Sequence, residues 1–258
     1  MEEYAIIIGI NHYTPVNKRG LQTLGGAIPD AEKIYEWIRS ETGGGVPEQN
    51  AFLIVSQDNP LNPIKHQIDE VISGITHQIL ERGVAAKRLY FYFAGHGLAV
   101  EDDDDNNGLC MANWNEIDKD IAALSSSDYR KKFKTGGLFQ EIVMWLDCCR
   151  QVQVLFHPQG GGVHRYGLTQ NPVYMKALAA QYENEAFEVS GPKGEKRGVF
   201  TEVLLEGLTG GADVDGQITA QSLTNYLYKH VPTRAQSYGY SQVPEIYGNH
   251  HEQNPIIF

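Results

Sequence analysis

The sequence predicts an α/β fold with a mostly parallel central sheet flanked by helices on both faces. Two short apolar runs, residues 89–93 and 142–146, are rich in aromatic and β-branched residues, as is typical of strands buried on both faces. Strand-like runs alternate with segments of helical apolar spacing, which favours a parallel sheet with crossover helices. With 258 residues and 41% hydrophobic composition, the chain can bury one substantial core. We therefore expect a single domain over residues 1–258.

In the first part of the chain, residues 4–10 predict the first strand. A helix is expected to open at Pro29 and Asp30, because apolar residues follow at helical spacing until glycines 43–45 end the pattern. Residues 51–55 predict the second strand. Asn62 is expected to cap the next helix, with Pro63 in its first turn and isoleucines along its buried face.

The two apolar runs supply the third and fourth strands. Beyond them, residues 174–180 predict a strand and residues 200–208 a helix. A second helix is expected over residues 220–230, entered from Thr219, whose hydroxyl suits a helix N-cap. Residues 242–247 predict a last strand.

Three polar stretches predict loops. Glu101–Asp105 is a run of five acids, residues 125–137 carry Lys131, Lys132 and Lys134, and residues 159–166 are rich in glycine. Long loops at strand ends often bind substrate or control activity, although solvated surface is an equally good interpretation of each.

Candidate catalytic side chains follow both apolar runs. Ala-Gly-His-Gly occupies residues 94–97, and Asp-Cys-Cys-Arg occupies residues 147–150. In open α/β sheets, sites collect where strands end. A thiol from Cys149 and an imidazole from His96 would supply a nucleophile and its base. Cys148 is expected to be an inert buried thiol, because neighbours in extended chain point to opposite sides.

These segments resemble a known family. Tyr-Phe-Ala-Gly-His-Gly and Leu-Asp-Cys-Cys-Arg resemble the His and Cys boxes of the caspase and metacaspase clan. Cys149-Arg150 is similar to caspases, whereas Asp147 is similar to metacaspases; Gln151-Val152 departs from the metacaspase pattern. The resemblance also includes residues 4–9, 24–31, 198–201 and 212–219.

The resemblance implies a caspase-like sandwich with a large-subunit-like half (1–155) and a small-subunit-like half (156–258). It implies a cysteine endopeptidase with a dyad of His96 and Cys149, which works through a thioester intermediate. The backbone N–H groups of Gly97 and Cys149 would bind the oxyanion, and glycine lets the main chain approach the substrate.

The resemblance also implies a primary pocket. Metacaspases cleave after Arg or Lys, and two of their pocket acids correspond to Asp30 and Asp147, whereas Ala27 and Ala94 replace a Cys and a Ser. Two converging carboxylates suit a guanidinium group. As alternatives, Asp30 could only stabilise a helix N-terminus, and Asp147 could only cap a loop amide. The Cys-Arg dipeptide keeps an Asp-cleaving, caspase-like enzyme as an alternative.

Other functions stay open from the sequence. A catalytically silent scaffold would keep the fold for partner binding, and an amidase or esterase would use the same acyl-transfer chemistry. A protease specific for basic residues could cut itself at Lys193, Lys196 or Arg197, or in the loop with Lys131–Lys134.

Composition restricts partners and location. The net charge of −11 disfavours nucleic acid. No apolar run is long enough for a membrane span, and the acidic start does not resemble a signal peptide. Three cysteines form no disulfide framework, which indicates a reducing cytoplasm. We expect a protein substrate with an exposed Arg or Lys and leave an activating partner open; the resemblance suggests a role in defence or cell death.

A cysteine peptidase with a dyad of His96 and Cys149 requires no cofactor, and we assign no metal site. Asp213–Gly216 lacks two major ligands of an EF-hand, so a turn is expected. The spacing of the acids in Glu101–Asp105 matches no calcium loop; calcium therefore stays an unplaced option. His250 and His251 are expected in an exposed tail, because no third ligand accompanies them.

Overall fold

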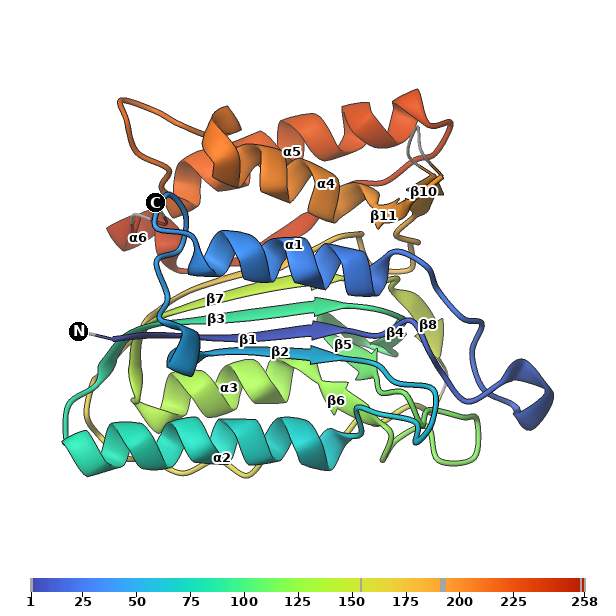
Figure 1. The fold of residues 1–258 in the computed structure, drawn as a ribbon, viewed down its shortest axis with the longest axis horizontal. Helices are drawn as coiled ribbons and strands as arrows, with labels where there is room; N and C mark the ends of the chain where they lie inside the picture. Colours follow the sequence, from blue (N-terminus) through green and yellow to red (C-terminus); the bar gives the residue numbers. More distant parts are fainter. Residues whose placement is uncertain (1, 154, 191–193, 256, 258) are drawn as a thin grey trace.

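The computed structural model describes residues 2–153, 155–190, 194–255 and 257. A six-stranded sheet forms its centre (Figure 1). In spatial order, its strands are β12 (Glu245–Gly248), β9 (Val173–Leu178), β7 (Phe139–Asp147), β3 (Ala86–Ala94), β1 (Glu3–Gly9) and β2 (Ala51–Val55). All neighbours pair in parallel except β12, which runs antiparallel to β9. The predicted α/β class with a mostly parallel sheet is confirmed.

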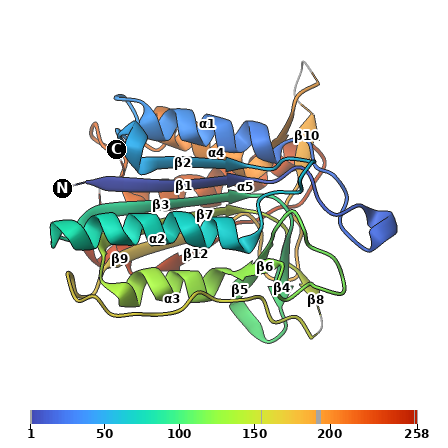
Figure 2. The same cartoon turned by 60° about the horizontal axis from the view of Figure 1, so that its bottom comes forward.

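Helices cover both faces of this sheet. One face carries α1 (Ala27–Arg39), α4 (Val199–Glu206) and α5 (Ala220–Ser237), whereas the other carries α2 (Lys65–Arg82) and α3 (Ser126–Gly136) (Figures 1 and 2). The spacing of apolar residues explains the packing, because α2 buries one isoleucine per turn. These isoleucines are Ile68, Ile72, Ile75 and Ile79.

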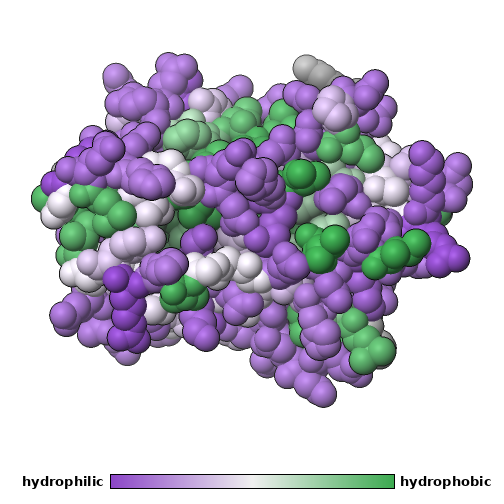
Figure 3. Space-filling view, turned by 90° about the horizontal axis from the view of Figure 1, so that it is seen from below, coloured by the Kyte–Doolittle hydropathy of each residue, from purple (hydrophilic) through white to green (hydrophobic). Residues whose placement is uncertain are grey.

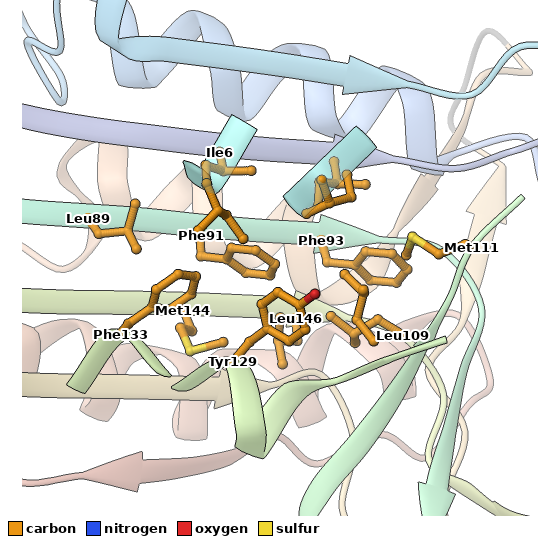
Figure 4. Packing of buried hydrophobic residues seen from close by; sticks show 14 of the residues in the cluster. Ile6, Leu89, Phe91, Phe93, Leu109, Met111, Tyr129, Phe133, Met144 and Leu146 are labelled. Carbon is orange, nitrogen blue, oxygen red and sulfur yellow. The ribbon is translucent and has the colours of Figure 1, made fainter. Parts of the chain in front are cut away.

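The two central strands are apolar on both sides. On β3, Phe91 and Phe93 face α2 and α3, whereas Tyr90 and Tyr92 belong to the core on the opposite face. Strand neighbours alternate between faces, so a strand between two helical layers needs a continuous apolar run. Figure 4 shows Phe91 packed near Phe133 of α3; their ring centroids lie 5.9 Å apart.

A second, four-stranded sheet lies at the carboxyl end of the central strands (Figure 2). Its order is β6 (Ala123–Ser125), β5 (Asp103–Cys110), β4 (Gly97–Val100) and β8 (Gln151–Gln153). The sequence did not predict these strands, and the acidic run expected as a solvated loop leads directly into β5. Asp105 pairs with Arg130 and Lys176, which is why part of this run is ordered and half-buried.

Two neighbouring segments of the chain connect the central sheet to the small sheet. Ala94 of β3 pairs with Asp147 of β7, and Leu98 of β4 pairs with Gln151 of β8. The segments between these paired positions leave the central sheet side by side and enter the small sheet side by side. Residues 95–97 and 148–150 are therefore neighbours in space.

Several predicted boundaries were wrong. The polar stretch 125–137 is not a loop: it forms the end of β6 and then α3, because Tyr129 and Phe133 provide a narrow buried stripe opposite the lysines. Helix α1 begins at Ala27, before Pro29. Helix α2 is capped at Ile64 instead of Asn62, and the Gln67 side chain accepts a hydrogen bond from the Ile64 N–H.

In the C-terminal half, the Thr219 hydroxyl caps α5 as predicted, by accepting from Ser222 N–H. Helix α5 continues past His230 to Ser237. His250 was wrongly expected in an exposed tail. It lies in α6 (His250–Gln253), is fully buried, and its Nε2 lies 3.1 Å from the Thr224 hydroxyl.

The remaining elements are short. They are η1 (Val16–Lys18), η2 (Glu48–Asn50), β10 (Glu188–Ser190), β11 (Lys196–Gly198) and the irregular turn η3 (Gly207–Gly211). Strands β10 and β11 pair antiparallel, so Lys196 and Arg197 lie in a strand; Lys193, a predicted self-cleavage position, lies outside the described residues.

The face formed by the outer sides of α2 and α3 is mainly hydrophilic, with hydrophobic residues in separate patches (Figure 3). Among the helices within the described ranges, none combines the length and apolarity needed to cross a membrane.

Candidate active site

His96 and Cys149 lie together at the carboxyl edge of the central sheet. Each follows a paired strand end by two residues, since Ala94 and Asp147 are partners in the ladder between β3 and β7. Parallel strands in register end at the same edge, so the sequence positions of these residues place both at that edge. Both side chains line one cleft of about 380 Å³.

The imidazole of His96 is oriented by main-chain and phenolic groups. Its Nε2 lies 2.8 Å from the carbonyl oxygen of Gln22. A carbonyl only accepts, so Nε2 carries the proton and Nδ1 of the neutral ring is the basic nitrogen. The N–H of His96 donates to the Tyr13 hydroxyl, and the two rings meet edge to face. Burial lowers the pKa of His96, which favours the neutral ring.

The thiol of Cys149 contacts the main chain of Ala186. Its Sγ lies 3.3 Å from the carbonyl oxygen and 3.4 Å from the nitrogen of Ala186. Burial raises the pKa of Cys149, which favours the neutral thiol. Within the described ranges, no hydrogen bond joins this thiol to His96. In this arrangement burial favours the neutral form of both side chains, and each lies against a backbone carbonyl.

Cys148 is buried, as predicted, and its Sγ contacts the Asn107 side chain of β5. Burial raises its pKa far above the ordinary range, so it remains a protonated thiol. Gly97 lies behind it at the start of β4, and a Cβ there would be only 2.6 Å from Cys148 Sγ. Gly97 therefore adjoins the cysteine segment, while the cleft itself is lined by Gly95 and His96 from that strand end.

The two predicted pocket acids line the same cleft as the thiol. Asp30, from the first turns of α1, accepts a 2.5 Å hydrogen bond from Gly198 N–H. Asp147 accepts from both the N–H and the hydroxyl of Thr201, at 3.1 and 2.7 Å. Gly198 separates the two acids, and any Cβ there would collide with the carboxyl group of Asp147. The predicted apolar neighbours Ala27 and Ala94 line the cleft beside them.

Both carboxyl groups have raised pKa values. Burial, followed by repulsion from Asp147, raises the pKa of Asp30 to about 8. Burial also raises the pKa of Asp147 to about 6, against the hydrogen bonds from Thr201. The structural alternatives for these residues are present too, since Asp30 lies near a helix N-terminus and Asp147 binds an amide of α4. Those contacts do not offset the cost of burying the negative charges.

A third acid, Glu188, was missed by the sequence reasoning. It lies on β10, accepts from the N–H groups of Gly25 and Gly26, and adds to the repulsion on Asp30 and Asp147. The alternation of Phe187 and Val189 around it was the available signal of a short strand. We call Asp30, Asp147 and Glu188 the acid pocket. In the part of the chain that the structure describes, no Lys or Arg lies within ion-pair distance of these three carboxylates.

Metal-binding groups are not found among the described residues, where no three His, Cys, Asp or Glu side chains form a cluster suited to an ion. The Asp213–Gly216 segment is a turn, as predicted, in which Gly216 N–H donates to the Asp213 carboxylate.

The comparisons with known proteins agree with this fold. A sequence profile of the caspase domain matches residues 2–254. A "probable protease" from a Desulfuromonadales bacterium is 26% identical over 269 residues, covering 95% of this chain and 32% of that protein. The chain thus spans about a third of the length of this curated relative.

Two solved structures share the architecture. A protein from Geobacter sulfurreducens matches with a TM-score of 0.59 at 14% identity, covering 96% of this chain and 93% of that one. Caspase-1 from Spodoptera frugiperda matches with a TM-score of 0.59 at 12% identity, covering 95% and 86%. The profile match over nearly the whole length settles the family: the chain belongs to the caspase-domain family of cysteine peptidases.

Proposed function

We propose that the protein is a cysteine endopeptidase that cleaves peptide bonds after Arg or Lys, with Cys149 as nucleophile and His96 as base. The observation that carries this proposal is the acid pocket, which opens into the cleft that holds the thiol and whose carboxylates have no described Lys or Arg at ion-pair distance, although Lys196 also lines the cleft. A side chain bound in that pocket would place the following peptide bond near Cys149.

The acid pocket favours a basic side chain on electrostatic grounds. Buried carboxylates that have no cation at ion-pair distance resist ionisation, as the raised pKa values of Asp30 and Asp147 indicate. A guanidinium or ammonium group would restore the ionised forms through charge-assisted hydrogen bonds. Ala27 and Ala94 offer apolar surface to the stem of such a side chain. An aspartate side chain would be repelled, which argues against the Asp-cleaving alternative.

The contacts of the two catalytic candidates support the proton transfers of acyl transfer. Gln22 holds Nε2–H, so Nδ1 of His96 would take the Cys149 proton. The sulfur would then attack the carbonyl carbon of the substrate and form a tetrahedral oxyanion. As this collapses, the C–N bond breaks and His96 returns the proton to the leaving amine. Water then attacks the thioester, with His96 again accepting a proton, and releases the acid and the thiol.

Stabilisation of the oxyanion is assigned to the backbone N–H groups of Gly97 and Cys149. The support for this role is that both residues leave the central sheet at neighbouring positions, and that the absence of a side chain at Gly97 lets its segment pack closely on Cys148.

The resting contacts suit a regulated enzyme. The Cys149 thiol donates to the Ala186 carbonyl and accepts from the Ala186 N–H. Burial also opposes ionisation of this thiol by raising its pKa. Substrate or an activating partner would have to move the segment around Ala186 before the thiol reaches His96. We place this enzyme in the cytoplasm, in keeping with its free thiols, and assign it a role in defence or cell death.

Peptides that differ only in the residue before the scissile bond test the proposal. Wild-type protein should cleave after Arg and Lys and leave the Asp peptide intact. Cys149→Ala and His96→Ala should lose peptide hydrolysis while keeping their melting temperature, whereas Cys148→Ala should keep most activity. Full activity in Cys149→Ala would refute the nucleophile, and preferred cleavage after Asp would refute the pocket alone.

A further inference from the structure

Asn107, on β5, joins the segments that carry His96 and Cys149. It is completely buried, and its Nδ2 lies 3.0 Å from Cys148 Sγ and 3.2 Å from the carbonyl oxygen of Cys149. A carbonyl oxygen only accepts, so the amide N–H groups are the donors here. One buried side chain thus holds the thiol of one cysteine and the main chain of the next.

The same amide packs on the histidine segment. A Cβ at Gly97 would lie 2.8 Å from Asn107 Nδ2, so this close approach requires glycine. Strand β5 also binds the main chain of His96, because Cys110 N–H donates to the His96 carbonyl at 3.0 Å. Asn107 therefore fixes the spacing between two segments that separate strands deliver to the cleft.

Asn107 is itself held firmly. Its backbone N–H donates to the hydroxyl of Ser126 at the start of α3, at 2.9 Å. Its Oδ1, in contrast, is buried without a hydrogen-bond partner among the described residues. A buried oxygen without a partner lowers the stability of the fold, and an apolar side chain would avoid that loss. The contacts of the N–H groups are the structural reason for an amide at this position.

We propose that Asn107 is a positioning residue of the peptidase reaction, an inference that rests on Cys149 being the nucleophile. By holding the Cys149 carbonyl, it fixes the backbone rotation after the Cys149 Cα and so the direction in which the thiol points. By packing on Gly97, it sets the distance between the two backbone N–H groups assigned to the oxyanion. Asn107 touches no substrate and acts only through these neighbours.

Two substitutions test this role. Asn107→Leu has a similar volume and no donor, and Asn107→Asp keeps the oxygens but loses the N–H groups. Each should lower kcat for an Arg peptide about 10- to 100-fold, the effect of losing one or two buried hydrogen bonds. KM should change less than about twofold, because the acid pocket is untouched. Asn106→Ala is the matched control, since Asn106 Oδ1 accepts from Ser125 and Ser127 at the start of α3; it should lower the melting temperature and leave kcat unchanged.

A second readout is independent of peptide cleavage. Mass spectrometry after iodoacetamide treatment gives the relative alkylation rates of Cys149 and Cys148. In wild type Cys149 should react much faster, and loss of the Asn107 donors should reduce this ratio about tenfold as Cys148 is released. An unchanged ratio together with unchanged kcat would overturn the role of Asn107 and leave the dyad standing. Activity that survives in Cys149→Ala would instead overturn the proposed function, whatever the Asn107 variants do.

Discussion

Two groups of acids in this molecule differ in whether they have counter-charges. The acid pocket faces the cleft without a Lys or Arg at ion-pair distance in the described chain. The second group, which we call the charge network, contains Asp105 and Glu245 with Arg130, Arg150 and Lys176. Asp105 lies 2.5 Å from Arg130 and 3.2 Å from Lys176, and Glu245 pairs with Arg150.

The pKa values show what this difference means. In the acid pocket, burial raises the pKa of Asp30 to about 8. In the charge network, burial lowers the pKa of Lys176 to about 8, but Asp105 opposes the shift. The charge network joins β5, α3, β9 and β12 with Arg150, which lies between β7 and β8, so its charges hold the architecture together. In the acid pocket, Lys33 lowers the pKa of Asp30 only partly and Lys196 lines the same cleft without reaching ion-pair distance, so the carboxylates keep room for a bound cation. Lack of a partner, and not acidity alone, distinguishes a candidate binding site here.

The largest expected effect comes from Asp147→Asn. Asparagine can still accept from Thr201, but it cannot pair with a cationic side chain. Breaking a buried charge pair costs about 3–5 kcal/mol, so kcat/KM for an Arg peptide should fall by a factor of about 10²–10⁴. The free energy of unfolding in urea should stay equal or rise, because an unbalanced buried charge is removed.

A large loss of stability with unchanged kcat/KM would mean that Asp147 only anchors α4 through Thr201.

An Asp-to-Asn substitution in the charge network should instead lower stability and leave activity unchanged. Asp105→Asn leaves the fully buried Lys176 without its carboxylate. The free energy of unfolding should fall by about 2–3 kcal/mol, at the low end for a buried pair because Asp105 is 30% exposed. Activity per folded molecule should remain, as active-site titration can establish. Asp102→Asn, in the exposed turn before β5, is the control and should change neither quantity.

Loss of the preference for Arg in Asp105→Asn would erase the distinction between the two groups.

The smallest expected effect is a pH dependence of cation binding. Because the pKa of Asp30 is raised, a bound guanidinium must displace a proton at neutral pH. Affinity for benzamidine should therefore rise with pH between about 5 and 8, by up to about tenfold per unit for one released proton. Calorimetry in two buffers of different ionisation enthalpy measures the number of protons released per benzamidine bound, and Asp30→Asn should reduce this number. A pH-independent affinity would show that the pocket is already ionised.

Folding stability should change with pH in the opposite direction to benzamidine affinity. The folded ligand-free protein binds more protons than the unfolded chain between the ordinary value of 3.8 and about 8. The contribution of Asp30 is thus most favourable at low pH and is lost as pH rises through this window.

Much of this structure could be predicted, because the strongest signals were long and apolar. The runs ending at Ala94 and Asp147 identified the central strands, and register then brings His96 and Cys149 together. The small sheet was missed because β5 begins in a run of acids, and the burial of Asp105 in that run depends on cations from α3 and β9. Helix α3 was missed because Tyr129 and Phe133 are the large apolar residues of its buried side, which is otherwise formed by Ser126 and Gly136.

The sequence predicted those parts of the site that are formed by side chains in recognisable motifs. Asp30 and Asp147 were found through family motifs, whereas Glu188 lies on a three-residue strand that leaves a weak pattern. The groups that orient the dyad candidates are the carbonyls of Gln22 and Ala186. A backbone carbonyl is common to every residue type, so no sequence pattern could reveal either of them.

The pairing of β3 with β7 has a consequence for folding. The two candidate catalytic side chains are brought together only by a parallel ladder between segments far apart in the sequence, and such contacts form late because the intervening chain must first be ordered. During synthesis, the imidazole leaves the ribosome long before the thiol, and Glu188 emerges later still. A nascent chain therefore has no competent cleft until its central sheet has closed. Hydrolysis of a small peptide would then report completion of the sheet during refolding.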